Sequence, residues 1–241
     1  MDFRKYFDFA EGTTPVILSC PHGGYKKPKR IPDKTMGPNI ADKNTYFISK
    51  LIINTLKKEG INIYYILNKI HRSKLDLNRP PLSPSALNIS STEANGIFHA
   101  FHDQLIKFSQ ECLTQFDKAL VIDFHGFTRP YKYYPDVIFG HIFGKTLDLI
   151  QDPMSDACER FWGCYHLEKE ISKHFSIDNG FADSEYSLAY SGGYITHQFL
   201  KTKNINTIQV EVAKNIRTDA SLTKKLVKAF TKAIIKSINE N

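Results

Sequence analysis

Residues 118–126 have the sequence KALVIDFHG, in which an apolar run ends on a histidine and a glycine. A nearly continuous apolar run predicts a strand covered on both faces, which is typical of a parallel sheet between helices. Polar residues at the end of such a strand lie at the carboxyl edge of the sheet. Open α/β sheets gather their functional groups at that edge.

Four further apolar runs surround this segment in the sequence. They are PVILSC at 15–20, INIYYIL at 61–67, PDVIFG at 135–140 and INTIQVEV at 205–212. Helical spacing of apolar residues predicts helices at 47–56, 94–116, 153–175 and 218–238. The stretches 79–92 and 176–193 are predicted to be irregular. We therefore expect one α/β domain over 1–241, a three-layer α/β/α fold with a mixed, mainly parallel sheet.

The bulk composition is that of a globular protein, with 41% hydrophobic and 24% charged residues in 241. The four cysteines form no C-x-x-C pair, so we expect reduced thiols and neither a zinc ribbon nor a disulfide framework. The N-terminal stretch MDFRKYFDFAEG is charged, and no run approaches the roughly 18–20 apolar residues of a membrane span. We expect a cytoplasmic protein without a membrane partner.

The net charge of +7 raises the question of an acidic partner. Five lysines lie on one face of the last predicted helix, as expected for a solvated face: Lys224, Lys225, Lys228, Lys232 and Lys236. No RNA- or DNA-binding motif is present, and no basic stretch alternates with stacking aromatic residues. We expect no nucleic-acid partner, and a small anionic substrate explains the charge at least as well.

Polar residues follow the apolar runs at four places. These are Pro21-His22-Gly23-Gly24, Asp76-Leu77-Asn78-Arg79, Asp123-Phe124-His125-Gly126 and Glu211 within its strand run. Two histidines and an acid at one edge form the ligand set of a catalytic zinc site, which keeps one position open. His22 and His125 are the natural pair, whereas a lone histidine is more often a hydrogen-bonded core or surface residue.

Five segments resemble motifs of the N-formylglutamate amidohydrolases, in the order of that family. They are VILSCPHGG, RSKLDLNRP at 72–80, VIDFHG, SGGYIT at 191–196 and IQVEV. The family is similar to zinc carboxypeptidases and aspartoacylases, so the resemblance implies a zinc-exopeptidase-like, phosphorylase/hydrolase-like fold. In those enzymes the acidic ligand lies three residues after the first histidine, where this chain has Tyr25. The resemblance points instead to Asp42, for which a helix N-cap is the alternative role.

The resemblance also implies roles for the other groups, with one Zn²⁺ per chain held by His22, Asp42 and His125. Glu211 is the implied general base and acid, and a glutamate within an apolar strand is costly to bury without a partner. Arg72 is the implied oxyanion stabiliser. For each arginine a structural ion pair is the alternative. Asn78 and Arg79 are implied to bind the substrate's carboxylate, and Tyr194 to make a further substrate contact. We expect Asp76 and Asp123 to support the histidines or to have a structural role, because an aspartate two residues before a ligand histidine is well placed to hold it.

The departures from the family concern residues around these groups. Glycines replace the serines usual after both histidines, Lys214 stands where an arginine is common, and residues 188–191 are Leu-Ala-Tyr-Ser where the family often has proline and phenylalanine.

From the resemblance and the implied ligand set, we predict a zinc-dependent hydrolase of an N-acyl amino acid such as N-formyl-L-glutamate. A peptidase or deacylase acting on peptide or cell-wall material and a non-catalytic basic binding protein are the alternatives. A Ser or Cys hydrolase is disfavoured because no G-x-S-x-G elbow occurs.

Overall fold

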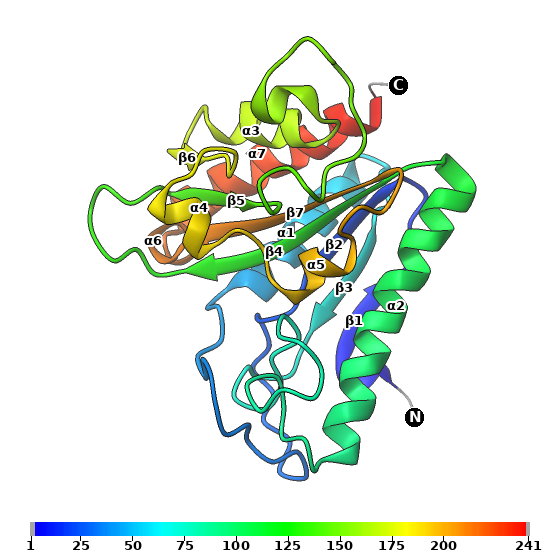
Figure 1. Ribbon diagram of the computed structural model, residues 1–241, viewed down its shortest axis with the longest axis vertical. Coiled ribbons are helices and arrows are strands. Elements are labelled where there is room, and N and C mark those ends of the chain that lie inside the picture. The colour runs from blue at the N-terminus through cyan, green and yellow to red at the C-terminus, as the bar shows by residue number, and fades with distance from the viewer. Residues whose placement is uncertain (1–2, 240–241) are drawn as a thin grey trace.

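The computed structural model describes residues 3–239 and contains a seven-stranded sheet with helices on both faces (Figure 1). The predicted domain 1–241 includes two residues at each end that lie outside the described residues. The strands are β1 (Phe7–Ala10), β2 (Val16–Cys20), β3 (Tyr64–Asn68), β4 (Ala119–Phe127), β5 (Val137–Gly140), β6 (Ile177–Asp178) and β7 (Ile205–Ala213).

The strands are arranged across the sheet in the order β1-β3-β2-β4-β7-β5-β6. The four central strands β3, β2, β4 and β7 run parallel. Strand β1 pairs antiparallel with β3, β5 pairs antiparallel with β7, and β6 runs parallel to β5. The prediction of a mixed, mainly parallel sheet is confirmed.

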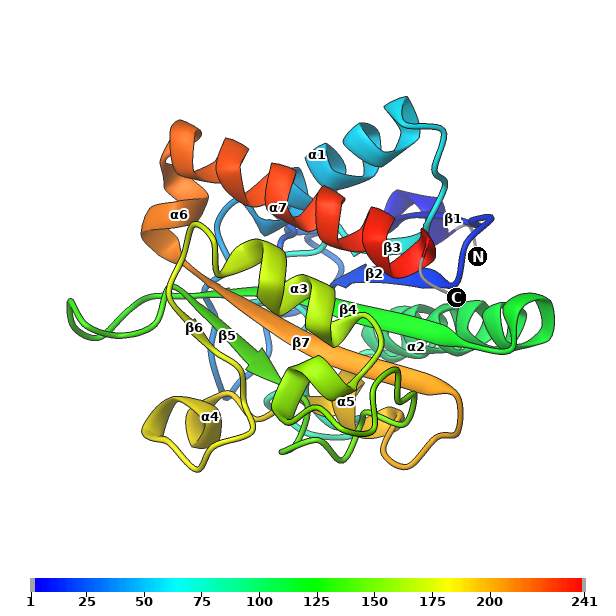
Figure 2. The ribbon, with the colours of Figure 1, turned by 90° about the horizontal axis from the view of Figure 1, so that it is seen from above.

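Helices α1, α3 and α7 cover one face of the sheet, and the long helix α2 lies on the other (Figure 2). The α-helices are α1 (Thr45–Lys58), α2 (Thr92–Phe116), α3 (Cys164–Ile171), α4 (Glu185–Ala189), α5 (Tyr194–Gln198), α6 (Lys214–Thr218) and α7 (Ala220–Asn239). Two short 3₁₀ helices, η1 (Phe3–Lys5) and η2 (Ala157–Arg160), complete the set of described helices. No helix within residues 3–239 is long and apolar enough to cross a membrane.

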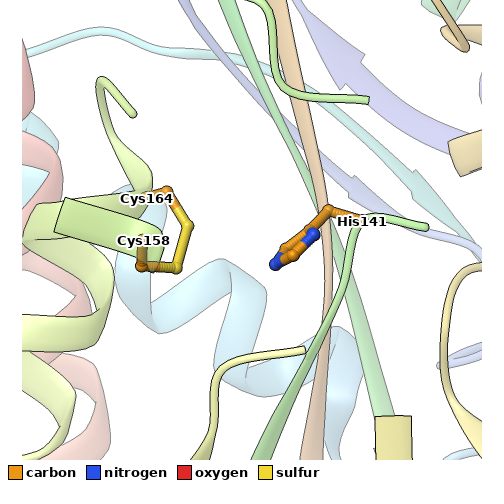
Figure 3. Close-up of side chains that lie close together, drawn as sticks. All are labelled: His141, Cys158 and Cys164. Carbon is orange, nitrogen blue, oxygen red and sulfur yellow. A yellow bond between two sulfur atoms is a disulfide. The ribbon is translucent and has the colours of Figure 1, made fainter. Parts of the chain in front are cut away.

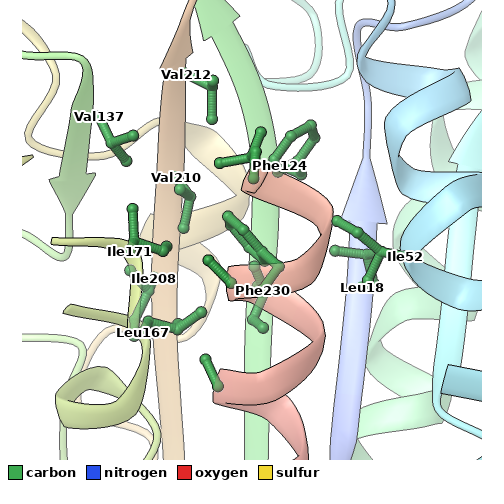
Figure 4. Close-up of a cluster of buried hydrophobic side chains, with 14 of the residues drawn as sticks. Leu18, Ile52, Phe124, Val137, Leu167, Ile171, Ile208, Val210, Val212 and Phe230 are labelled. Atoms are coloured by element: carbon green, nitrogen blue, oxygen red, sulfur yellow. The ribbon is translucent and has the colours of Figure 1, made fainter. Parts of the chain in front are cut away.

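Two buried clusters hold the layers together, one on each face of the sheet. On one face the ring of Phe230 in α7 meets that of Phe124 in β4 edge-on, with centroids 5.5 Å apart (Figure 4). On the other face, Phe101 of α2 packs on Phe7, and Phe108 packs on Tyr64. Because β4 is covered on both faces, its side chains are apolar in both directions until the strand reaches the carboxyl edge.

Several elements differ from the sequence-based prediction. The stretch 176–193, predicted to be irregular, contains β6 and α4, and the short helices α5 and α6 were not predicted. The helix predicted at 153–175 is replaced by η2 and α3, which are separated by Gly163 with φ +77°. A glycine with positive φ interrupts a helix without steric cost. Strands β1 and β6 were not predicted, because they have only four and two residues and lie at the sheet edges, where the apolar pattern is weak.

Glu170 connects α3 to α7 through ion pairs with three lysines. Its buried carboxylate lies 2.7 Å from Lys173 Nζ, 2.8 Å from Lys236 Nζ and 3.4 Å from Lys232 Nζ. Burial alone would raise the pKa of Glu170, but the lysines lower it to about 2. The group therefore stabilises the fold fully above its ordinary pKa of 4.5, and this contribution is lost as the pH falls toward 2.

We predict that Glu170→Gln lowers the Tm at pH 7 relative to the wild type, because three lysines lose their common partner. The difference in Tm should shrink as the pH is lowered from 4.5 toward 2, which thermal unfolding at a series of pH values measures. Glu59→Gln, at an exposed position, is the matched control and should change Tm little at any pH. A Tm difference for Glu170→Gln that does not depend on pH would contradict this account.

Candidate metal centre and active site

The parallel strands β2, β4 and β7 bring three of the predicted site residues to one edge of the sheet. His22 follows the end of β2 by one intervening residue, and His125 lies two residues before the end of β4. His125 is the direct partner of Glu211 in the β4–β7 register. Because alternate residues of a strand share a face, Asp123 lies on the same side of β4 as His125.

Two buried carboxylates orient the two imidazoles. His22 Nε2 lies 2.7 Å from Asp76 Oδ1, and His125 Nε2 lies 2.8 Å from Asp123 Oδ2. Each carboxylate accepts a hydrogen bond from Nε2, so the lone pair of each ring is left on Nδ1. The two Nδ1 atoms are 3.1 Å apart, a separation that two bonds of roughly 2 Å to a common ion can span.

Asp42 contributes the third of these converging atoms. Its Oδ2 lies 3.5 Å from Nδ1 of His22 and 3.5 Å from Nδ1 of His125, and it accepts a hydrogen bond from the Gly126 amide. The alternative role of N-cap is not what the structure shows. The N-cap of α1 is Asn44, which makes no side-chain capping bond.

The three converging atoms are all acceptors, and they are buried. Three such atoms around one point repel one another unless a proton or a metal cation lies between them. Burial alone would lower the pKa of His125, but Asp123 and Asp42 hold it well above its ordinary value. Burial alone would raise the pKa of Asp42, but the two imidazoles hold it well below its ordinary value. The donor set, two imidazole nitrogens and one carboxylate oxygen with carboxylates behind the rings, fits a catalytic zinc ion.

A second group of metal-type side chains, His141, Cys158 and Cys164, does not fit a metal ion. Cys158 and Cys164 form a disulfide, shown in Figure 3, so their sulfurs carry no thiolate. Nδ1 of His141 accepts a hydrogen bond from the Gly144 amide, and Nε2 donates one to the Asn179 carbonyl. Both ring nitrogens are therefore occupied.

The disulfide corrects the expectation that all four thiols are reduced. The two cysteines are six residues apart in sequence, and their Cα atoms lie 5.3 Å apart. The chain turns between them at Gly163, a local reversal that the spacing of the cysteines alone did not predict. The other two cysteines, Cys20 and Cys112, are free and buried.

Arg72 lies between two of the carboxylates. Its Nε donates to Asp76 Oδ2 at 2.8 Å, and its Nη1 donates to Asp42 Oδ1 at 3.3 Å. These contacts are structural ion pairs, the alternative role for this residue. Its Nη2 has no hydrogen-bond partner among residues 3–239, and the side chain lines a cavity beside the two histidines.

This cavity has a volume of about 320 Å³. Arg79 contributes to its wall, and its guanidinium has no hydrogen-bond or ion-pair partner among the described residues. Backbone of the glycine pair Gly192-Gly193 closes another side of the cavity. The cavity is thus bounded by His22, His125 and Asp42, by an arginine with no ion pair among the described residues, and by a loop.

Glu211 is connected to this loop through a neighbouring amide. Gln209 Nε2 donates to Glu211 Oε1 at 3.0 Å, and Gln209 Oε1 accepts from the Gly193 amide at 2.8 Å and from Asn78 Nδ2 at 3.1 Å. Asn78 Oδ1 in turn accepts from the Ile195 amide. The side chain of Asn78, expected to hold substrate, therefore binds this loop and lines the cavity at the same time.

Burial raises the pKa of Glu211 to about 7, with nearby His125 acting in the opposite direction. A carboxyl group with a pKa near neutrality can both accept and return a proton at physiological pH. The position of Glu211 in the cavity wall gives it access to a bound molecule.

Tyr194 is not among the described residues that line the cavity, whereas Tyr190 is. Tyr194 packs against His102 and Phe98 of α2, with ring centroids 5.2 and 6.0 Å apart. His102 is buried in the same aromatic group, and burial lowers its pKa to about 4. This environment is that of a packed core residue and not of a functional histidine.

Two residues of the site were not singled out from the sequence. Gln209 could have been found from its place two residues before Glu211, because that spacing puts both side chains on one face of β7. No sequence motif or periodicity pointed to Tyr190, because it lies in a segment predicted to be irregular, whose path the apolar pattern does not predict.

No protein-family model matches the sequence, and no curated protein matches it. Solved structures do match. The N-formylglutamate amidohydrolase from Ralstonia eutropha JMP134 superposes with a TM-score of 0.70 at 14% identity, over 97% of this chain and 98% of that one. A gene product of Agrobacterium tumefaciens superposes with a TM-score of 0.67 at 14% identity, over 96% of this chain and 94% of that one. The motif resemblance and the architecture therefore agree, and the chain has the fold of the N-formylglutamate amidohydrolase from Ralstonia eutropha.

Proposed function

We propose that this protein is a zinc-dependent amidohydrolase that cleaves the amide bond of a small N-acyl amino acid with a free carboxylate. N-formyl-L-glutamate is the first substrate to test, given the motifs and the similarity to the enzyme from Ralstonia eutropha. The observation that carries the proposal is the convergence of three buried acceptor atoms, Nδ1 of His22, Nδ1 of His125 and Oδ2 of Asp42.

In this proposal His22, Asp42 and His125 hold one zinc ion per chain. Zinc, when bound, supplies Lewis acidity for a water nucleophile and for the amide carbonyl. Glu211 takes the proton of the attacking water and returns it to the departing nitrogen, a task that suits its pKa of about 7. Gln209 fixes the direction of that carboxylate through its hydrogen bond to Oε1.

The arginine N–H groups in the cavity wall that have no partner among the described residues are assigned to the oxygen atoms of the substrate. The free Nη2 of Arg72 donates to the oxygen that gains negative charge as the amide carbonyl is attacked. Arg79 binds the substrate's carboxylate, because its planar guanidinium has no other partner among the described residues. Asn78 supports this wall, and Tyr190 takes the place of Tyr194 as the tyrosine that faces the substrate.

The size of the cavity favours a small substrate over peptide or cell-wall material. About 320 Å³ is at the lower end of the range of ligand pockets. The unpaired Arg79 at this cavity also favours a molecule with a free carboxylate over a long chain. A non-catalytic binding protein would not need Glu211 buried beside the ligand group with a raised pKa.

We predict that protein purified without chelator and given zinc binds close to one equivalent per chain and hydrolyses N-formyl-L-glutamate or another N-acyl amino acid in a substrate screen. His125→Ala should bind no zinc with comparable affinity, because one of three ligands is lost. Metal analysis and isothermal titration measure both. Less than a tenth of an equivalent in the wild type, with no activity restored by zinc, would support the basic binding protein instead.

We predict that Glu211→Gln keeps the zinc stoichiometry but lowers kcat by roughly 10²–10⁴-fold, because the amide cannot accept the proton. Glu159→Gln, at an exposed position outside the cavity, is the control and should retain wild-type kcat. Steady-state kinetics with a zinc assay on the same samples separate proton transfer from metal loss. Retention of kcat by Glu211→Gln would remove this residue from the proposed chemistry.

We predict that Arg79→Ala raises KM for the carboxylate substrate about 10–100-fold, as loss of a charge-assisted hydrogen bond of about 1.5–3 kcal/mol requires. The corresponding substrate with its carboxylate amidated should be turned over equally by variant and wild type. Arg160→Ala, an exposed arginine outside the cavity, serves as the control. A wild-type KM for the carboxylate substrate in Arg79→Ala would favour a peptide substrate that does not use this anchor.

A further inference from the structure

Arg217 in α6 is a buried arginine that makes no ion pair within the described part of the chain. Only 3% of its surface is exposed. Its guanidinium instead donates to three backbone carbonyls, those of Val212, Phe127 and Lys43. The Nε–Val212 and Nη2–Phe127 distances are 2.9 and 3.0 Å.

The three carbonyls belong to the three segments that carry the proposed chemistry. Lys43 follows Asp42, Val212 follows Glu211, and Phe127 lies two residues after His125. A single planar group with five N–H donors thus joins the ends of β4 and β7 to the loop before α1. Lysine has the charge but not the fork of donors needed to reach all three carbonyls at once.

Two more hydrogen bonds connect the same segments of the chain. Asn44 Nδ2 donates to the Arg217 carbonyl at 2.7 Å, and the Gly126 amide donates to Asp42 Oδ2 at 3.1 Å. The oxygen that receives the second bond is the one that faces the two imidazoles. The position of Asp42 relative to His125 therefore depends on the distance between the loop before α1 and the end of β4, which Arg217 fixes.

Gly126 leaves the space that Arg217 occupies. A Cβ atom built on Gly126 would overlap the guanidinium and lie 2.7 Å from its Nη2. Gly126 does not have positive φ, so the requirement is for space and not for backbone conformation. This accounts for the glycine after His125, where the resembling family usually has serine.

We propose that Arg217 is a positioning residue for the metal centre, and that Gly126 and Arg217 are a matched pair. Arg217 holds Asp42, His125 and Glu211 at the separation at which they act together, without touching the substrate. This inference rests on the proposed function, because it assigns the three residues to one reaction. It adds a residue that none of the five sequence motifs contains.

The test compares zinc affinity, measured by competition with a chelator, and the visible spectrum of the cobalt-substituted protein in four variants. Arg217→Met should bind zinc roughly 10–100-fold more weakly and show a changed cobalt spectrum, as expected when the groups that orient ligands are lost. Its kcat should fall more than its KM changes, because Arg79 is untouched. Gly126→Ala should shift the same quantities in the same direction.

The double variant Gly126→Ala/Arg217→Met distinguishes a matched pair from two independent effects. Its zinc affinity should be close to that of Arg217→Met alone, because a methionine side chain can yield to the added methyl group. Additive losses would overturn the pairing. Ile234→Ala, in the buried part of α7, is the stability control, and it should lower Tm without changing zinc affinity or the cobalt spectrum.

The outcomes also separate this inference from the proposed function. An Arg217→Met protein with wild-type zinc affinity and cobalt spectrum, and only a lower Tm, would overturn the inference alone. If Arg217→Met does not fold, Arg217→Lys provides the same readouts, and wild-type values there would likewise overturn it. Absence of zinc binding in the wild type would overturn the proposed function, and this inference with it.

Discussion

The hydrogen bonds from two imidazoles to two buried carboxylates determine which ring nitrogen each histidine presents at the carboxyl edge of this sheet. Asp76 and Asp123 each bind Nε2 of a histidine, so both rings present Nδ1 to the same point. If either carboxylate were absent, its ring could carry the proton on the inner nitrogen, and the group of acceptors would lose a member. Asp76 also accepts the Nε–H of Arg72, so this one carboxylate contacts both His22 and Arg72.

Much of the fold could be predicted from the sequence, because the central strands are buried on both faces. Five apolar runs correspond to β2, β3, β4, β5 and β7, and the parallel character of the centre follows from their continuity. The edge strands could not be predicted in this way. Strand β1 carries Asp8 in the middle of four residues, and its pairing with β3 depends on a tertiary contact that leaves no periodic signal.

In the site, the residues carried by strands could be predicted, and those carried by loops could not. His22, His125 and Glu211 lie at or near strand ends, so their meeting is a consequence of the topology alone. Asp42 came only from the resemblance, and its approach to the histidines depends on the path of the loop before α1. The positions of Tyr190 and Tyr194 depend on the turn at the glycine pair, where Gly192 has φ +141°, and no pattern of residue types predicted which ring faces the cavity.

The pairing of β4 with β7 extends over nine consecutive residue pairs, from Ala119 with Ile205 to Phe127 with Ala213. His125 and Glu211 are therefore carried by one rigid ladder, whereas Arg79, Tyr190 and the glycine pair are carried by connecting segments. Mutations can accumulate in those segments without shifting the ladder. The residues proposed to contact substrate can thus change without displacing the pair proposed to do the chemistry, and residues 188–191 of this chain lie in one of these connecting segments.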